Sequence, residues 1–239
     1  MRKNQKAHTS RDRLIAIGDI HGCVHTLQSL LEKIEYNKET DTLVFIGDYI
    51  DRGNFSCETV KFLIQLQQDA GEDKVICLRG NHEQMLIHAV ERGGEYIWTL
   101  NGGGATLESY ERNGISIDFH IDWFKSLPLA YDTPFIIFCH AGLSFPKIAD
   151  NRIDDLLWGR DWISQDKEPR EKQVIFGHTP SISGLMYTTD TSDICIDTGC
   201  VFGGNLCALI INPDGSATCT YEPKNGADDI KTDEEPTTL

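Results

Sequence analysis

A short stretch of glycines and charged residues at positions 47–53 reads Gly-Asp-Tyr-Ile-Asp-Arg-Gly. It holds two carboxylates, Asp48 and Asp51, and one guanidinium, Arg52. Carboxylates this close repel each other unless a cation compensates their charge. Arg52 alone cannot compensate both while also facing a ligand, whereas a divalent metal ion bound through oxygen ligands can. Taken alone, the stretch is equally compatible with a glycine-rich turn capped by aspartates.

The elements around this stretch repeat a simple order. Apolar runs at 14–17, 42–46 and 74–78 predict three buried strands. Each run leads into a polar loop and then into a segment with helical periodicity. This repetition predicts a parallel sheet with right-handed crossovers, in which ligands bind outside the carboxyl ends of the strands. We therefore expect the three polar loops to lie close together.

The second half of the chain contains more strands. Apolar runs predict strands at 135–139, 173–176 and 194–196, followed by a hairpin of strands at 206–211 and 217–221. A short helix or turn is predicted over 153–162, and it carries Arg160. The glycine-rich segment 92–104 is predicted to be a connecting loop. Its three successive glycines, 102–104, favour a plain loop over a phosphate cradle, because no strand precedes them and no Lys-Ser/Thr follows.

Several residues at these strand ends are of types that bind metals. They are Asp19, His21, Asp48, Asn81, His140 and His178. Mixed nitrogen and oxygen ligands favour Mn, Fe or Zn over Ca. The set is too large for one ion, so we expect two ions that share Asp48. One site would use Asp19, His21 and Asp48, and the other Asp48, Asn81, His140 and His178. Two such ions can hold a bridging hydroxide and clamp an in-line phosphoryl displacement.

Other polar residues of the same loops suit the remaining steps. His82 follows Asn81, and a free imidazole there can protonate a departing oxygen. Asp51 is the nearest candidate to fix its tautomer. Arg52 and Arg160 are predicted to bind the phosphoryl oxygens through their planar, forked guanidinium groups. No nucleophilic side chain is needed, because hydroxide attacks directly.

Composition limits the class of protein. The chain has 239 residues, 40% of them hydrophobic and 25% charged, which suits one soluble globular domain. A net charge of −15 argues against nucleic acid as a partner, because phosphate backbones recruit basic surfaces. The eight cysteines form no CxxC pair and are expected to be free thiols in a reducing compartment. We expect a flexible N-terminus at 1–12, one domain at 13–224 and an acidic disordered tail at 225–239.

No apolar run approaches the length of a membrane span, and the basic N-terminus lacks the apolar region of a secretory signal. We therefore expect a cytoplasmic protein that contacts no membrane, and we expect it to be a monomer.

Five motifs in chain order carry a resemblance to a known family: GDIHG, GDYIDRG, RGNHE, HAG and GHTP. They resemble those of the PPP family of metal-dependent phosphoprotein phosphatases. The segments LLWGRDW and IDTGCVFGGNL also resemble the compact bacterial and phage-type branch, which includes the lambda phage protein phosphatase. The resemblance runs from about Leu14 to Tyr221.

This resemblance implies an α/β (α+β) calcineurin-like metallophosphoesterase fold, a central β-sandwich of two mixed sheets flanked by helices. It also implies the metal ligands given above, Arg52 and Arg160 as phosphate ligands, and His82 with Asp51 as the acid pair. The implied cofactors are two divalent metal ions, Mn²⁺ first, with Fe or Zn as alternatives.

Two enzyme activities and one non-enzymatic function are compatible with these residues. The favoured one is a phosphoprotein phosphatase acting on phosphoserine and phosphothreonine, with phosphotyrosine as a further substrate. The alternative is a symmetrical diadenosine tetraphosphatase, because such enzymes resemble the same branch. They usually lack the aspartate of the DRG motif and carry GNHD, whereas Asp51 and Glu83 stand at those places here. A metal-binding module without catalysis would require a broken site, and every expected ligand is present.

Overall fold

The computed structural model describes residues 13–160, 171–224 and 229 of the chain. Ten strands form two sheets in this part of the chain. The first sheet has the order β10-β9-β1-β2-β3, from β1 (Leu14–Ile17), β2 (Thr42–Phe45), β3 (Val75–Cys77), β9 (Asn205–Ile211) and β10 (Ala217–Pro223). The second has the order β4-β5-β6-β8-β7, from β4 (Ala130–Asp132), β5 (Ile136–Cys139), β6 (Gln173–Phe176), β7 (Tyr187–Thr188) and β8 (Ile194–Cys195).

Both sheets are mixed, as predicted. In the first, β1, β2 and β3 are parallel, and β9 runs antiparallel to both β1 and β10. In the second, β5, β6 and β8 are parallel, and the edge strands β4 and β7 are antiparallel to their neighbours. The parallel strands of each sheet therefore bring their carboxyl ends to one edge.

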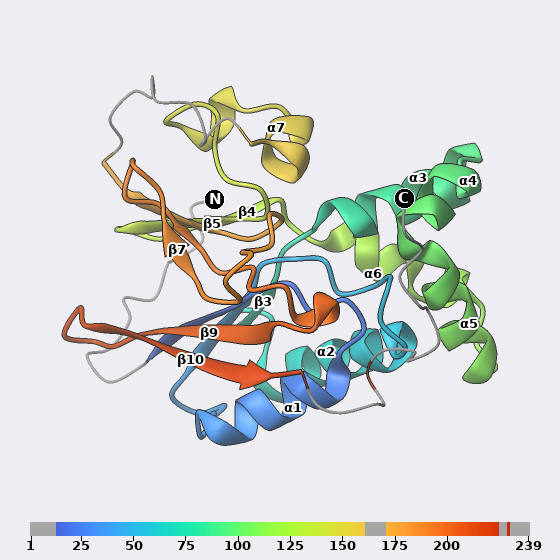
Figure 1. The fold of residues 1–239 in the computed structure, drawn as a ribbon, viewed down its shortest axis with the longest axis horizontal. Coiled ribbons are helices and arrows are strands. Elements are labelled where there is room, and N and C mark those ends of the chain that lie inside the picture. The colour runs from blue at the N-terminus through green and yellow to red at the C-terminus, as the bar shows by residue number, and fades with distance from the viewer. Residues whose placement is uncertain (1–12, 161–170, 225–228, 230–239) are drawn as a thin grey trace.

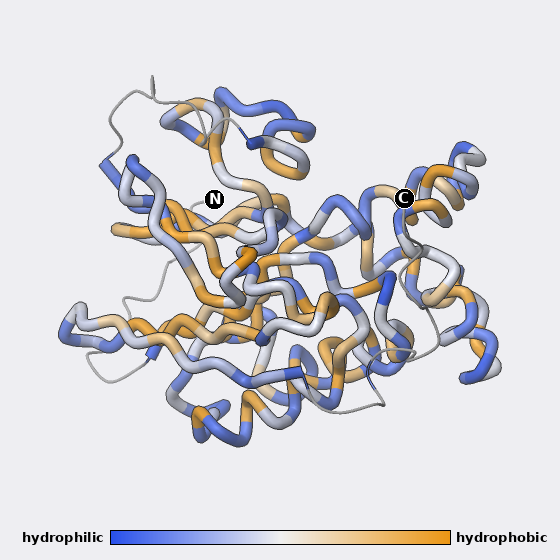
Figure 2. The backbone as a smooth tube through the Cα atoms, viewed as in Figure 1, coloured by the Kyte–Doolittle hydropathy of each residue, from blue (hydrophilic) through white to orange (hydrophobic). Residues whose placement is uncertain are grey.

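The two sheets pack face to face between helices (Figure 1). Successive strand side chains point to opposite faces, so Ile15 and Ile17 pack toward helices while Ala16 packs toward the other sheet. The layer between the sheets joins Ala16 to buried residues of the second sheet such as Phe138 and Ile175. Figure 2 shows the hydrophobic residues concentrated along these central strands, with hydrophilic residues along the outer loops and helices.

The helices are arranged around this sandwich (Figure 1). α1 (Val24–Lys33) and α2 (Ser56–Ala70) cover the outer face of the first sheet, and α7 (Ile153–Trp158) lies over the second. The remaining helices lie to one side: α3 (Asn81–Arg92), α4 (Glu95–Trp98), α5 (Gly104–Arg112) and α6 (Ile121–Ser126). Short 3₁₀ turns span Ile117–His120, Ile148–Asp150 and Cys200–Phe202.

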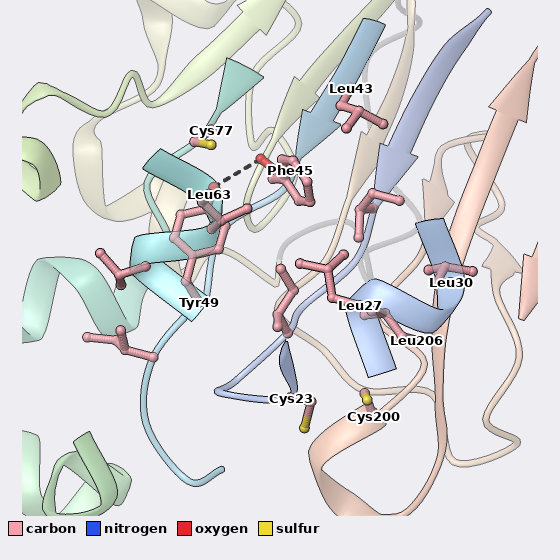
Figure 3. Close-up of a cluster of buried hydrophobic side chains, with 14 of the residues drawn as sticks. Cys23, Leu27, Leu30, Leu43, Phe45, Tyr49, Leu63, Cys77, Cys200 and Leu206 are labelled. Carbon is pink, nitrogen blue, oxygen red and sulfur yellow. Dashed lines mark hydrogen bonds between the residues drawn. The ribbon is translucent and has the colours of Figure 1, made fainter. Parts of the chain in front are cut away.

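Tyr49 anchors the loop after β2 to the core (Figure 3). Its side chain is fully buried, and its hydroxyl lies 3.2 Å from the Phe45 carbonyl and 2.5 Å from the Leu78 carbonyl. A buried phenol needs such partners, because an unpaired polar group in the core is costly. One side chain thereby joins the ends of β2 and β3, which carry two of the polar motifs.

The structure corrects three expectations about elements. Segment 92–104 is mostly helical, with α4 followed by a π-helical turn at Thr99–Gly103, because tertiary contacts override the weak helix propensity of glycine. The segment 153–162, predicted to be a short helix or turn, forms a helix that ends at Trp158, and 161–162 lie outside the described residues. β4 and β7 were not predicted, because their sequences, Ala-Tyr-Asp and Tyr-Thr, form no apolar run of the kind that marked β3 and β8.

Most residues at the two ends of the chain lie outside the described part of the structure. The predicted flexible segment 1–12 and most of the predicted disordered tail 225–239 lie outside the described residues. Asp229 does not follow the prediction of a loose tail, because its side chain is fully buried. Its carboxylate accepts hydrogen bonds from the Thr26 N–H (3.0 Å) and hydroxyl (2.6 Å) at the start of α1. Within the described ranges, every helix is too short or too polar to cross a bilayer.

Candidate metal centre

The predicted metal-binding residues follow the carboxyl ends of five strands. Asp19 and His21 follow β1, Asp48 follows β2, and Asn81 follows β3 as the first residue of α3. His140 and His178 follow β5 and β6 of the second sheet. All six side chains are buried. The site therefore lies where the two sheets meet.

Direct contacts link residues of the two sheets. The His178 backbone N–H donates to Asp19 Oδ2 at 3.0 Å, and His140 Nε2 lies 3.4 Å from Asp48 Oδ1. Asn81 Oδ1 lies 2.8 Å from His140 Nε2 and 2.9 Å from His178 Nδ1. The Asn81 oxygen faces one nitrogen of each of these two imidazoles, and His140 also faces the Asp48 carboxylate, so these side chains point their donor atoms at a common place.

Two groups of three donor residues share Asp48. One is His21–Asp48–His82 and the other Asp48–His140–His178, with the donor atoms of each group within 4.8 Å of one another. The sharing of Asp48 follows the sequence prediction. The first group differs from the prediction by including His82, which was assigned to proton transfer, in place of Asp19. The role of each residue stays a prediction.

The donors of this site fit metal ions. Two buried side-chain atoms of the site, Asp19 Oδ1 and His178 Nε2, have no hydrogen-bond partner among the described residues. Burial and the nearby Asp197 carboxylate raise the pKa of Asp19 well above its usual range, so Asp19 needs a nearby cation to stay charged. The Arg52 guanidinium lies 2.6 Å from His21 Nε2. A guanidinium can only donate, so this nitrogen is the acceptor and faces a positive charge.

Two of the imidazoles are oriented by a hydrogen bond between Nδ1 and a backbone carbonyl. His21 Nδ1 lies 2.8 Å from the Ile50 carbonyl and His140 Nδ1 lies 3.1 Å from the Ile46 carbonyl. These carbonyls accept the Nδ1 proton and leave Nε2 as the ligating atom, which is the usual arrangement at metal sites. Burial is the main cause that lowers the pKa of His178 to about 3, so its ring stays neutral, as a ligand must be.

Backbone conformation sets this region apart. Among the described residues other than glycine, seven have a positive φ, and five of them belong to the site. These five are His21 (48°), Asp48 (54°), Asp51 (75°), Arg52 (70°) and His178 (67°). L-residues pay roughly 1 kcal/mol or more for the left-handed region, and such strain persists where surrounding contacts impose it. The loops are thus held in shapes that aim these side chains inward.

The predicted acid pair is formed inside the protein. His82 Nδ1 lies 2.6 Å from Asp51 Oδ2, and both side chains are buried. His82 Nε2 lies 3.9 Å from Asp48 Oδ2, so the free nitrogen faces the metal-binding residues. Burial raises the pKa of Asp51, and its hydrogen bonds to His82, Thr106 and Trp98 act against this rise.

The two arginines lie beside the histidines. The Arg52 guanidinium lies 5.3 Å from the centroid of the exposed Phe202 ring, in addition to its contact with His21. Arg160 is exposed, and its Nε donates to Thr179 Oγ1 at 3.2 Å, one residue after His178. Arg52 therefore contacts a residue of the first donor group, and Arg160 contacts the residue that follows His178 of the second.

Two buried acids of the site were not predicted from the sequence. Asp197 follows β8, and burial together with Asp48 raises its pKa to about 6, although the Gly199 N–H bonds to it at 3.0 Å. Glu83 accepts the backbone N–H groups of Asp48 and Gly80 (both 2.9 Å) and of Tyr49 (2.8 Å). The signal for Asp197 was available, because it follows an apolar run in the same way as the predicted ligands.

The comparison with protein families matches this site and fold. The profile of the family described as calcineurin-like phosphoesterase matches residues 12–210, and the chain belongs to this family. The protein is therefore a metallophosphoesterase, a hydrolytic enzyme of a family that uses two divalent metal ions, and the His and Asp clusters fit a dinuclear site.

Individual relatives differ in their named activities. The chain is 26% identical to a symmetrical bis(5'-nucleosyl)-tetraphosphatase of Vibrio cholerae, over 81% of this chain and 93% of the relative. It is 30% identical to serine/threonine-protein phosphatase 2 of Salmonella typhimurium, over 80% and 88%. A serine/threonine phosphatase structure of Saccharomyces cerevisiae shares the fold, with a TM-score of 0.67 at 18% identity over 90% of this chain and 80% of that one.

Proposed function

We propose that this metallophosphoesterase is a phosphoprotein phosphatase of the compact bacterial and phage-type branch. Its substrates are phosphoserine and phosphothreonine in proteins or peptides, with phosphotyrosine as a further substrate. The likeness to a serine/threonine-protein phosphatase of Salmonella typhimurium over most of both chains supports this proposal. The Vibrio cholerae relative makes the nucleotide substrate the alternative to exclude.

The observation that carries the proposal is the buried pair of His82 and Asp51, 2.6 Å apart. Hydrolysis of a serine or threonine phosphoester expels an alkoxide, a strong base that needs a proton as it leaves. Cleavage within a nucleoside polyphosphate expels a phosphate group, a far weaker base that leaves without one. A positioned general acid contributes roughly 10²–10⁴-fold where it is needed, so its presence favours the monoester.

The residues of the site divide the remaining work. Asp19, His21, Asp48, Asn81, His140 and His178 would hold the two ions, Mn²⁺ first and Fe or Zn as alternatives. When bound, such a pair supplies a hydrolytic nucleophile at neutral pH and neutralises charge on the phosphoryl group. Arg52 and Arg160 bind the phosphoryl oxygens and orient the ester. Asp51 keeps the proton on His82 Nδ1, so that Nε2 can deliver a second proton to the leaving oxygen.

A symmetrical diadenosine tetraphosphatase activity is the second candidate, and one feature favours it. A hollow of about 550 Å³ lies beside Phe202, whose ring contacts Arg52. None of the described residues that line it carries a charge, and Pro180 and Ile182 add apolar surface. Such a hollow suits an uncharged base stacked on an aromatic ring.

Turnover of a phosphoserine peptide and of diadenosine tetraphosphate decides between the two. The protein is stripped with a chelator and reloaded with Mn²⁺, and kcat/KM is measured for both substrates under one set of conditions. We expect chelator inactivation, recovery with Mn²⁺ and a higher kcat/KM for the peptide. A higher kcat/KM for the dinucleotide would replace the proposal with the second candidate. Activity that survives chelation would contradict both.

A further inference from the structure

The helical segment 95–106 contacts the Asp51 carboxylate of the acid pair. Trp98, at the end of α4, is buried, and its Nε1–H points between the two Asp51 oxygens, at 3.0 Å from Oδ1 and 2.9 Å from Oδ2. The Thr106 hydroxyl, in α5, donates to Asp51 Oδ1 at 2.6 Å and accepts the Asp51 backbone N–H at 2.9 Å. The Asp51 side chain thus has a donor on each side in addition to His82.

Glycines allow this segment to approach. A side chain on Gly103 would place its Cβ 2.6 Å from the Trp98 ring, and one on Gly102 would place it 2.7 Å from the Arg52 side chain. Gly102 also has a φ of 102°. Its carbonyl accepts the Arg52 N–H at 3.1 Å. The run of glycines is therefore a support for the loop that carries Asp51 and Arg52, rather than a plain connection.

We infer that Trp98 and Thr106 are positioning residues for leaving-group protonation, acting through Asp51 on His82. A carboxylate can rotate about its last bond, and two fixed donors hold it with Oδ2 toward His82 Nδ1. Without them Asp51 is free to turn, and the imidazole loses the contact that orients its free nitrogen. Neither residue touches the donor atoms of the metal centre. The inference rests on the proposed function, because it needs a substrate whose leaving group requires a proton.

The dependence on the leaving group tests this role. The variant Trp98→Phe keeps an aromatic ring and removes the N–H donor, with a ring smaller than the indole. We measure kcat and KM on a phosphoserine peptide and on p-nitrophenyl phosphate, whose leaving group is a weak base that needs little protonation. Supporting residues of this kind typically cost roughly 10–100-fold when removed. We expect a loss of that size in kcat for the peptide, an unchanged KM and less than about a threefold loss for p-nitrophenyl phosphate.

Trp123→Phe is the matched control. The Trp123 Nε1–H donates to Gln67 Oε1 at 2.9 Å, so this variant also loses one indole hydrogen bond, away from Asp51. We expect it to leave the ratio of the two activities unchanged. An equal loss on both substrates in Trp98→Phe, or no loss on either, would overturn the inference, because a purely structural role has no preference for leaving group.

A second pair of variants covers the case in which Trp98→Phe does not fold. Thr106→Val removes the hydroxyl at nearly constant volume, and Thr106→Ser keeps it. We expect the leaving-group dependence in the valine variant and its rescue in the serine variant. Equal behaviour of the two would count against the inference.

His82→Asn, measured in parallel, distinguishes failure of the positioning role from failure of the proposed function. If it loses peptide turnover selectively and the Trp98 and Thr106 variants do not, the positioning role fails alone. If wild-type protein turns over neither monoester, the proposed function fails with it.

Discussion

The two donor groups that meet at Asp48 are built differently. Around His21–Asp48–His82, the contacting side chains are charged and reactive, because Asp51 bonds to His82 and the Arg52 guanidinium lies on His21. We call this the acid half. Around Asp48–His140–His178, the contacts are mainly to Asn81 and to backbone groups, such as the Ile46 carbonyl and the His178 N–H. We call this the imidazole half.

The two halves therefore suit different tasks: the acid half suits reaction with a substrate, and the imidazole half suits binding of a cation. The acid half belongs to one sheet and carries groups that can move a proton or bind phosphate. The imidazole half joins both sheets, and its contacts mainly fix ring orientation; beside it only Arg160, which bonds to Thr179, is predicted to bind phosphate. Asp48 is the one residue that both halves need. Variants at and around Asp48 therefore tell whether the halves are separable.

Asp48→Asn is expected to have the largest effect, because it removes the charge shared by both halves. Residues that merely support a ligand cost roughly 10–100-fold in metal affinity, so loss of a shared ligand should exceed that for both ions. Elemental analysis of metal per protein after Mn²⁺ loading measures it. Asp41→Asn is the control, since Asp41 is equally buried and lies away from the site. One ion retained in full would show that Asp48 does not bridge.

His82→Asn is expected to affect the acid half alone. Turnover of a phosphoserine peptide should fall roughly 10²–10⁴-fold, because a general acid is lost. The metal content should stay at the wild-type value, since the predicted ligands remain. Kinetics and metal analysis on the same preparation check both statements. Loss of one ion would move His82 from the acid to the ligands, which its place in the first donor group also permits.

Glu83→Gln is expected to loosen the acid half without removing a ligand. Three backbone N–H groups at the ends of β2 and β3 point at this buried carboxylate, and an amide offers only one acceptor oxygen to them. Burial and the Asp48 charge raise the pKa of Glu83 to about 7, so the charge is only partly present at neutral pH. A hydrogen bond contributes about 0.5–1.5 kcal/mol net, so we expect the free energy of unfolding to fall by about 1–2 kcal/mol.

Urea unfolding of the metal-free protein measures the Glu83→Gln effect directly. The control is Glu91→Gln, which breaks an exposed pair with Lys125 and should change stability little. If both variants unfold at the wild-type midpoint, the carboxylate does not hold the loops, and their left-handed backbone must be imposed by other contacts.

The acid half and the imidazole half were not equally visible in the sequence. Predicted ligands such as Asp48 and His178 each follow an apolar run after one glycine. The carboxyl ends of parallel strands meet at one edge, so the pattern predicted that these residues lie close together. Trp98 and Thr106 follow no strand, and the glycines of segment 92–104 predicted a loop around Trp98. What places them is a contact between segments about 50 residues apart, which no local pattern encodes. The burial of Asp229 was not predicted for the same reason, because the composition of the tail does not indicate a contact with the distant start of α1.

The pair of Arg13 and Asp41 gives the smallest expected effect and a contrast to both halves. It lies at the other end of the first sheet, before β1 and β2, and no predicted ligand contacts it. Burial would raise the pKa of Asp41, but bonds from Arg13 (3.0 and 2.5 Å) and the Asn37 N–H outweigh it and lower the pKa.

A lowered folded-state pKa means that the contribution of Asp41 to stability is complete above the unfolded value of about 3.9. It is lost as the pH falls through the folded value. Since Arg13 is partly exposed, we expect Asp41→Asn to cost only about 1 kcal/mol at pH 7. Urea unfolding at pH 7 and pH 3 should show the difference from wild type shrinking at the lower pH. Metal content and kcat should stay unchanged, because stability here is separate from the centre. A difference that grows at pH 3 would mean that the carboxylate is not the group that titrates.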